Sequence, residues 1–187
     1  MTTTKKSRSK TRRSPRQPKA IALLTKDHKH VDSLFRKFQR LDEDAEEEKR
    51  ALLEQICTSL TIHATIEEEI FYPEVRAALE DDEEASELLD EANVEHTSIK
   101  ALVAQLEGAD PGDEMVSARV KVLGEYVKHH VKEEEGELFS YAKKAKELDL
   151  DELGDRLEER KAELEAEAGL EPAVARSNGT GRARARR

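Results

Sequence analysis

The sequence predicts an all-α fold, an antiparallel up-down-up-down four-helix bundle with disordered basic tails. Charged residues make up 40% of the 187 residues and aromatic residues only 4%, with no Trp. This composition is typical of long-helix bundles and unusual for β-sandwiches. Four long stretches place apolar residues three, four or seven positions apart, as one face of a helix requires. The links between these stretches are short, so neighbouring helices are expected to run antiparallel.

The first two predicted helices cover about residues 19–41 and 46–80. The inner stripe of the first helix is formed by Ile21, Leu24, His28, Val31, Phe35 and Phe38. The inner stripe of the second helix is formed by Leu53, Ile56, Leu60, His63, Glu67 and Ile70. Pro73 cannot donate a backbone hydrogen bond, so we expect a kink or break just past Glu67.

The third and fourth predicted helices cover about residues 83–107 and 113–148, separated by a Gly- and Pro-containing turn at 108–112. The inner stripe of the third helix is formed by Leu89, Ala92, His96, Ile99, Val103 and Leu106. The inner stripe of the fourth helix is formed by Val116, Val120, Leu123, Val127, His130, Glu134 and Leu138. We therefore place the bundle at residues 19–148. Leucines spaced among charges predict a short amphipathic C-terminal helix at residues 149–168.

Both ends of the chain are strongly basic. Residues 1–20 hold eight Lys or Arg and residues 176–187 hold five Arg, and neither stretch contains an acid. The remaining residues hold 19 bases and 42 acids, so the net charge of −10 conceals an acidic body with cationic ends. Both ends have too few apolar side chains to offset the entropy of ordering. We therefore predict disordered basic tails at residues 1–18 and 169–187.

Two His-x-x-x-Glu pairs, one on the second helix and one on the fourth, each lie on a single helical face. A lone histidine precedes the first pair by 35 residues, and another precedes the second pair by 34 residues, so the chain repeats one helical hairpin. Four helices that each aim an imidazole at one axis, two of them adding a carboxylate, predict a dinuclear metal site inside the bundle. The predicted metal ligands are His28, His63, Glu67, His96, His130 and Glu134.

A histidine in an apolar stripe is more often a packed core residue than a ligand, and for His28 or His96 taken alone that interpretation is favoured. It weakens because all four helices place a histidine near their midpoint, in register. Glu67 and Glu134 strengthen the metal interpretation, since a carboxylate on an inner stripe without Lys or Arg is costly to bury unless it binds a cation.

Other polar residues near the pairs are interpreted as accessory. We expect His30 to be solvated and His129 to lie at the surface or behind the ligands. Glu68 and Glu135 follow the ligand glutamates and are expected to support them by hydrogen bonds. Tyr126 either packs between helices with its hydroxyl outward or points toward the metals.

The ligand types indicate the metal. Four imidazoles and two carboxylates without a thiolate suit iron, with manganese or zinc as competitors. A carboxylate from each of two helices can bridge two ions. The single cysteine, Cys57, excludes an internal disulfide and a cysteine-only metal site. Ferritin-type sites use Glu-x-x-His on two helices, so ferritin and rubrerythrin match this pattern poorly.

Four local features carry a family resemblance. They are His28 within Asp-His-Lys-His-Val-Asp-Ser-Leu-Phe, the His63/Glu67 pair followed by Phe71-Tyr72-Pro73, the Glu95-His96 pair, and the His130/Glu134 pair followed by Leu138-Phe139. Over about residues 21–146 the chain resembles the HHE cation-binding domain of the hemerythrin family. The resemblance implies a four-helix bundle that holds two iron ions in a non-haem di-iron centre with an oxo- or hydroxo-type bridge. It also implies chemistry with O2, peroxide or nitric oxide, with the four histidines as terminal ligands and the two glutamates as bridges.

One departure from the family pattern bears on function. Oxygen-carrying hemerythrins have a second histidine on the third helix, four residues from the first, whereas Ala92 and Lys100 flank His96 here. Each iron of a symmetric site then keeps an open position. This favours catalase-like peroxide disproportionation over reversible O2 storage. The iron–sulfur-repair branch of the family carries a cysteine-bearing N-terminal module, and residues 1–20 contain no Cys, so that role loses support.

We therefore expect a cytoplasmic di-iron protein that reacts with or binds O2 or hydrogen peroxide, and whether it turns over a substrate stays open. One alternative is an iron-, oxygen- or nitric-oxide-responsive sensor or interaction protein without turnover. Another is weak, nonspecific nucleic-acid binding through the tails, whose thirteen cations have no interleaved aromatic residues for base stacking. The tails could instead aid solubility or bind the acidic body. No apolar run is long enough to span a bilayer and no secretory signal is expected, so no membrane partner is predicted; the oligomeric state is not predicted.

Overall fold

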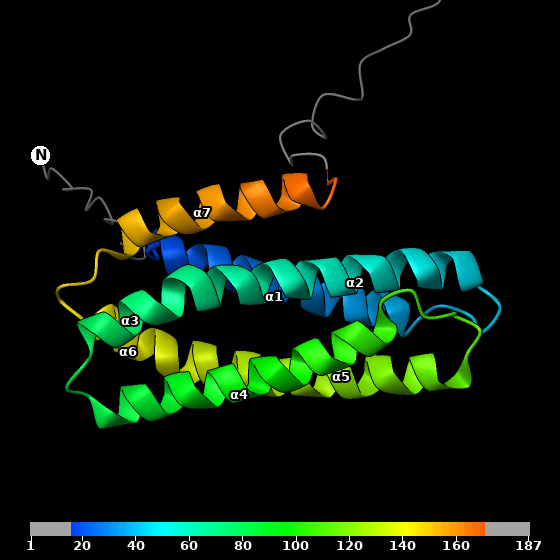
Figure 1. Ribbon diagram of the computed structural model, residues 1–187, viewed down its shortest axis with the longest axis horizontal. Helices are drawn as coiled ribbons and strands as arrows, with labels where there is room; N and C mark the ends of the chain where they lie inside the picture. The colour runs from blue at the N-terminus through cyan, green and yellow to red at the C-terminus, as the bar shows by residue number, and fades with distance from the viewer. Residues whose placement is uncertain (1–15, 171–187) are drawn as a thin grey trace, which may run out of the picture.

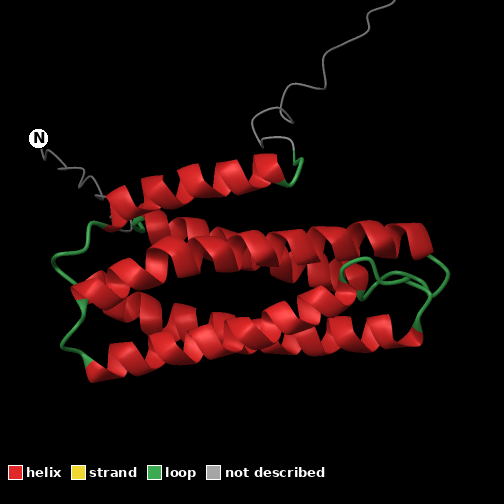
Figure 2. Cartoon of the chain, in the orientation of Figure 1, coloured by secondary structure: helices red, strands yellow, loops and turns green. Residues whose placement is uncertain are grey.

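The computed structural model describes residues 16–170, so the tails predicted at 1–18 and 169–187 lie almost wholly outside it and stay predictions. The described part is all-helical, as predicted, and contains no strand (Figure 2). Its elements are α1 (Lys19–Phe38), α2 (Glu46–Ile66), η1 (Glu67–Phe71), α3 (Tyr72–Ala78), α4 (Glu83–Leu106), α5 (Glu114–Glu133), η2 (Glu134–Leu138), α6 (Phe139–Lys144) and α7 (Leu150–Glu167). Within residues 16–170, no helix is both long and apolar enough to cross a membrane.

The long helices α1, α2, α4 and α5 lie side by side along the long axis, with successive helices joined at alternate ends (Figure 1). Helix α1 packs on α2 and α5, and α4 packs on the same two helices. Helices α3 and α6 continue α2 and α5 beyond the π-helical segments η1 and η2. Helix α7 lies outside this group, against α1 and α2.

Aspartate side chains set where three of the helices begin. Asp82 accepts a hydrogen bond from the backbone N–H of Ala85 at the start of α4. Asp113 caps α5 in the same way, and Asp149 accepts two backbone hydrogen bonds at the start of α7. Each cap satisfies backbone donors that lack a partner within the helix and places negative charge at its positive end.

The hydrophobic core is divided into two clusters by the predicted ligands. On α1, Ile21 and Leu24 belong to one cluster and Val31 and Phe35 to the other, with His28 between them. The same division occurs on α2 and α4, and along α5 into η2, where Val127 and Leu138 on either side of His130 belong to different clusters. Tight packing on both sides therefore holds the histidines at one level of the bundle.

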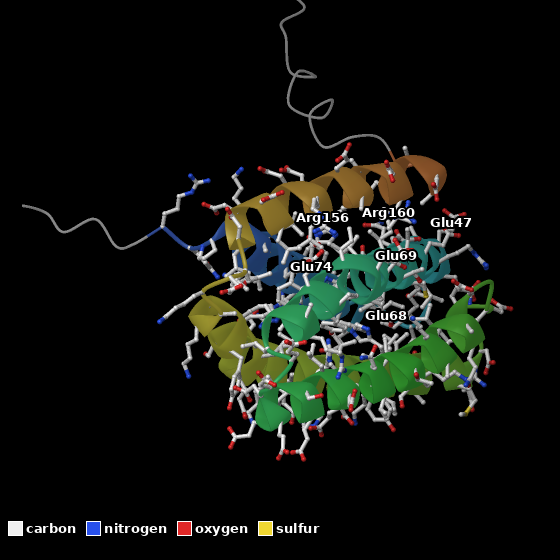
Figure 3. The ribbon with its side chains drawn as sticks, turned by 60° about the vertical axis from the view of Figure 1, so that its left-hand side comes forward. Glu47, Glu68, Glu69, Glu74, Arg156 and Arg160 are labelled. Atoms are coloured by element: carbon white, nitrogen blue, oxygen red, sulfur yellow. The ribbon has the colours of Figure 1, made fainter. Side chains whose placement is uncertain are left out.

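Helix α7 docks through a narrow apolar edge and several ion pairs. Its buried leucines are Leu150, Leu153 and Leu157. Gly154 permits close approach to α1, because a Cβ at that position would lie only 2.4 Å from Cβ of Lys19. The guanidinium groups of Arg156 and Arg160 reach Glu74 and Glu69 at 2.6 and 2.7 Å (Figure 3). The C-terminal helix is thus fixed against the elements that carry part of the predicted site.

Candidate metal centre

All six predicted ligands converge at the middle of the bundle. Each is at most 6% exposed, and the two glutamates are the first residues of η1 and η2. Their ligand atoms form two groups, each within 4.8 Å, that share Glu67. One group consists of His28, His63, Glu67 and Glu134, and the other consists of Glu67, His96 and His130.

The four imidazoles form two facing pairs. Nε2 of His28 lies 3.0 Å from Nε2 of His63, and Nε2 of His96 lies 3.1 Å from Nε2 of His130. Neighbouring ligand atoms held about 2.0–2.1 Å from one ion lie roughly 2.9–3.4 Å apart. Each pair therefore has the spacing of two nitrogen ligands on a single ion.

Carboxylates hold the outer nitrogen of three of these rings. Nδ1 of His28 lies 2.9 Å from Oε1 of Glu135, and Nδ1 of His96 lies 2.9 Å from Oε1 of Glu68. Nδ1 of His130 lies 2.8 Å from Oε2 of Glu95. A carboxylate accepts a hydrogen bond from the Nδ1–H group, which keeps the proton on that nitrogen and leaves the opposite nitrogen of a neutral imidazole unprotonated.

The fourth ring has a looser partner. Nδ1 of His63 lies 3.9 Å from Oδ2 of Asp27, and neither atom has a hydrogen-bond partner among the described residues. Both residues are buried. The Asp27 carboxylate is nevertheless aimed at this ring, so all four imidazoles have a carboxylate on their outer side.

The hydrogen bonds of His96 and His130 favour a cation between the two rings. With Nδ1 of His96 and of His130 both donating to carboxylates, the two Nε2 atoms carry lone pairs that face each other at 3.1 Å. Two lone pairs cannot form a hydrogen bond, and a positive ion between them converts the repulsion into ligation. The donor set, with imidazole and carboxylate atoms only, suits a transition metal.

The two glutamates lie between the histidine pairs. Oε2 of Glu67 is 3.2 Å from Nε2 of His63 and 3.5 Å from Nε2 of His96, one ring of each pair. Glu134 makes the complementary contacts, at 3.2 Å to His28 and 3.6 Å to His130. Both oxygens of Glu67 and Oε2 of Glu134 are buried without a hydrogen-bond partner in the described chain. Each carboxylate is thus placed to bridge two ions.

The electrostatics of the six residues also favour a cation. Burial and the adjacent charge of Glu134 raise the pKa of the Glu67 carboxyl well above its ordinary value. Burial and the neighbouring His130 lower the pKa of His96 to about 4, and burial lowers the pKa of His63. The last two rings are therefore neutral near pH 7, which is the form that ligates metals.

The π-helical segments bring in a residue that the sequence pattern missed. In an α-helix Tyr72 would be rotated by about 140° from Glu67. Segment η1 places an extra residue in the turn, so Tyr72 returns to the inner face, where it is buried. Its hydroxyl donates to Oε1 of Glu134 at 2.8 Å and lies 3.3 Å from Nε2 of His96. Burial raises the pKa of this phenol, which therefore remains a donor. The interruption expected at Pro73 occurs as this π turn.

Lysines neutralise two of the outer carboxylates. Lys100 binds Glu68, which holds His96, and Lys161 of α7 binds Asp27, which faces His63. Lys100 lies four residues after His96, where we expected no metal ligand. Its side chain binds Glu68 and does not point at the centre.

A narrow apolar cavity reaches the four imidazoles. Its other walls are Val31, Leu60, Ala64, Ile99, Val127 and Val131. The free volume is about 10 Å³, close to that of a single water molecule. A small uncharged molecule suits such a cavity better than an ion does.

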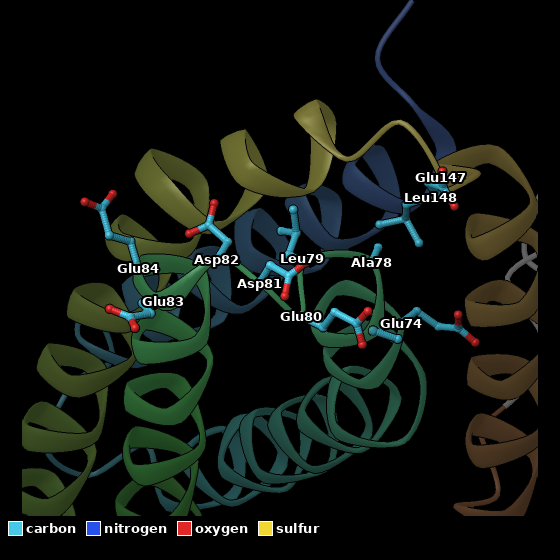
Figure 4. Close-up of a pocket in the computed structure, with 11 residues that line it drawn as sticks. Glu74, Ala78, Leu79, Glu80, Asp81, Asp82, Glu83, Glu84, Glu147 and Leu148 are labelled. Carbon is cyan, nitrogen blue, oxygen red and sulfur yellow. The ribbon is translucent and has the colours of Figure 1, made fainter.

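A much larger cavity, of about 1010 Å³, lies at the end of the bundle (Figure 4). It is lined by α3, the loop between α3 and α4, and the loop before α7, and its walls are predominantly acidic. None of the six predicted ligands lines it, so this cavity is separate from the candidate metal centre.

The accessory residues differ from expectation in one respect. Glu68 and Glu135 hydrogen-bond to His96 and His28, not to the ligand glutamates. Each of these glutamates follows its ligand glutamate by one residue, so its side chain points toward a histidine on an adjacent helix. His30 and His129 are exposed, as expected. Tyr126 is 47% exposed, and Tyr72 is the tyrosine that reaches the centre.

The chain is similar to one protein family, to a solved structure and to a longer protein. The model of the hemerythrin HHE cation-binding domain family matches residues 19–142. A crystal structure of a hemerythrin HHE cation-binding domain-containing protein from Mycobacterium kansasii aligns with a TM-score of 0.67 at 22% identity, over 88% of this chain and 96% of that one. A DNA nickase from Nostoc sp. is 31% identical over 118 residues, which are 63% of this chain and 32% of the relative. The match therefore covers about a third of that relative's length.

Proposed function

The chain belongs to the hemerythrin HHE cation-binding domain family, and from that premise we propose that it is a non-haem di-iron protein that reacts with O2 or hydrogen peroxide. One observation carries the proposal: two pairs of imidazole nitrogens face each other beside glutamate oxygens that have no hydrogen-bond partner within residues 16–170. Two cations in an antiparallel up-down-up-down four-helix bundle satisfy all of these groups together.

The residues present assign the ligand roles. His28 and His63 would hold one iron and His96 and His130 the other, with Glu67 and Glu134 as bridges. Two irons held there would supply the redox chemistry for a reaction with O2 or peroxide.

The protein contributes orientation, a proton donor and exclusion of water. The carboxylates on the outer nitrogens fix the orientation of the imidazoles, which raises their strength as ligands. The Tyr72 hydroxyl holds its proton against Glu134, within 3.3 Å of His96. The apolar cavity beside the imidazoles admits small neutral molecules and little water.

Peroxide disproportionation is favoured over reversible O2 storage. A carrier would need one accessible and one saturated metal ion, whereas the six ligand residues present would leave room for peroxide at both ions. Ala92 offers no ligand atom, and Lys100 binds Glu68, so no extra protein ligand comes from those positions.

Oxygen evolution from hydrogen peroxide tests this activity. We expect the iron-loaded full chain to evolve O2 well above a Glu67→Ala variant, which lacks one bridge. If the wild type evolves no more than this blank and forms a stable, reversible O2 adduct, the chain is a carrier or sensor and the catalytic proposal is wrong.

A second candidate, nucleic-acid binding through the tails, is favoured by the twelve cations of residues 1–18 and 169–187 and by the relative described as a DNA nickase. Retention of the full chain on DNA should fall steeply with salt, because phosphate binding releases counterions. A chain trimmed to residues 18–170 should lose retention and keep its iron spectrum. Salt-insensitive binding by the trimmed chain would contradict the tail assignment, and relaxation of supercoiled plasmid would test nicking.

A further inference from the structure

A second His-x-x-x-Glu pair lies on the outer side of α5, one residue before the ligand pair. His129 is 57% exposed, and its Nε2 lies 3.2 Å from Oε1 of Glu133. Oε1 of Glu95, on α4, lies 3.4 Å from the same nitrogen. Ligand atoms about 2.0–2.1 Å from a tetrahedral ion lie about 3.3 Å apart, which both distances from His129 match. All three ligand atoms lie within 4.8 Å of one another, close enough for one divalent cation.

Glu95 connects this outer cluster to the buried centre. Its Oε1 faces His129, and its Oε2 lies 2.8 Å from Nδ1 of the ligand His130. One carboxylate thus contacts both the surface histidine and a predicted ligand. An ion held by the outer cluster would lie one side chain away from the centre.

A small cavity continues inward from the cluster. Glu95 and Glu133 line it together with the ligands His130 and Glu134, and its remaining walls are apolar. Oε2 of Glu134, in a residue only 2% exposed, has no hydrogen-bond partner in the described part of the chain. The cavity volume is about 10 Å³, enough for one water-sized particle. Glu95 and Glu133 therefore lie at the outer end of this cavity, and Glu134 lies at its inner end.

The charges around Glu95 differ from those around Glu68 and Asp27, the carboxylates that face two other ligand histidines. At Glu68 and Asp27 a lysine neutralises the outer carboxylate. At Glu95 the neighbouring groups are His129 and a second carboxylate, Glu133, which leaves two negative charges around an imidazole. A site of one sign beside low-dielectric walls concentrates ions of the opposite sign.

We propose that Glu95, His129 and Glu133 form an outer divalent-cation site through which ions reach the buried centre. This inference rests on the proposed function, since it requires a centre to fill. The six inner ligands are buried, so an ion needs a route inward. The path past Glu133 and Glu95 carries three carboxylates, those two and Glu134, whereas no carboxylate lines the other cavity beside the imidazoles.

Ferrous iron uptake by metal-free full-length protein tests the proposal. The protein is mixed anaerobically with Fe²⁺, uptake is stopped with a chelator at intervals, and retained iron per chain is counted. His129→Asn combined with Glu133→Gln should slow uptake roughly tenfold, the scale of electrostatic focusing, and leave the final content unchanged. Glu95 is kept, because it also holds His130. His30→Asn combined with Glu54→Gln is the control, with the same chemical changes at exposed positions on α1 and α2.

A second measurement examines the site directly. Iron-filled wild type, titrated with Mn²⁺ and followed by electron paramagnetic resonance, should bind one further, weaker ion that the double variant does not bind. Equal uptake rates, a lower final iron content in the variant, or no additional Mn²⁺ in wild type would each overturn the outer site. If wild type itself retains no iron, the proposed di-iron function fails, a result distinct from slow filling.

Discussion

Replacing Glu67 by methionine should reverse the stability order of the protein between its metal-free and metal-loaded forms. Glu67 is fully buried, and both of its oxygens lack a hydrogen-bond partner among residues 16–170. A buried unsatisfied polar atom costs about 1–3 kcal/mol, so metal-free Glu67→Met should be more stable than metal-free wild type by at least about 2 kcal/mol. Methionine fills a similar volume, and the neighbouring His63 and His96 have lowered pKa values, so no unpaired charge remains.

With metal present the order should invert. A ligand at a thousand times its Kd stabilises the folded state by about 4 kcal/mol, and the variant loses a bridging ligand and most of that gain. Urea unfolding followed by circular dichroism, with and without a chelator, measures both differences. Glu54→Met, at an exposed position of α2, should change neither difference by more than about 0.5 kcal/mol. A metal-free Glu67→Met protein that is less stable than metal-free wild type would refute the reasoning.

Three further outcomes follow from the same contacts. Because the pKa of Glu67 is raised in the folded chain, the contribution of Glu67 to the stability of the metal-free protein should fall as pH rises above about 4.5. The stability advantage of Glu67→Met over wild type should therefore grow between pH 5 and 8, and a constant difference in urea midpoints would contradict this. Tyr72→Phe removes the hydrogen bond to Glu134 and should lower the free energy of unfolding by about 1.5–3 kcal/mol at unchanged iron content; an unchanged urea midpoint would show that the bond contributes nothing. Gly154→Ala places a Cβ against the backbone of α1 and should cost about 1–3 kcal/mol and expose α7 to protease; wild-type resistance would mean that α7 can shift freely.

The helices and the convergence of the six proposed ligands could be predicted because both depend on periodicity. Each inner stripe repeats at helical spacing, and the histidines interrupt these stripes at matching depths. The predicted ranges agree with the observed helices to within a few residues, except that the second and fourth contain η1 and η2. All six predicted ligands come together because a bundle aligns residues at equal depth.

Tyr72 and the outer carboxylates could not be predicted in the same way. Regular periodicity places Tyr72 away from Glu67, and only the π turn returns it to the inner face. The contact between Glu95 and His130 joins two helices, so it depends on their relative rotation. One signal was available: the resemblance includes Phe71-Tyr72-Pro73 and the Glu95-His96 pair, which periodicity alone does not explain.

Metal content of freshly purified full-length protein tests the central claim most directly. We expect about two irons per chain by elemental analysis, with near-ultraviolet charge-transfer bands, because two imidazole pairs share two carboxylates. Glu67→Ala and Glu134→Ala should each lower the iron content and leave the helical signal intact. A colourless protein that holds a single zinc, or one that holds no metal after iron supplementation, would contradict the account.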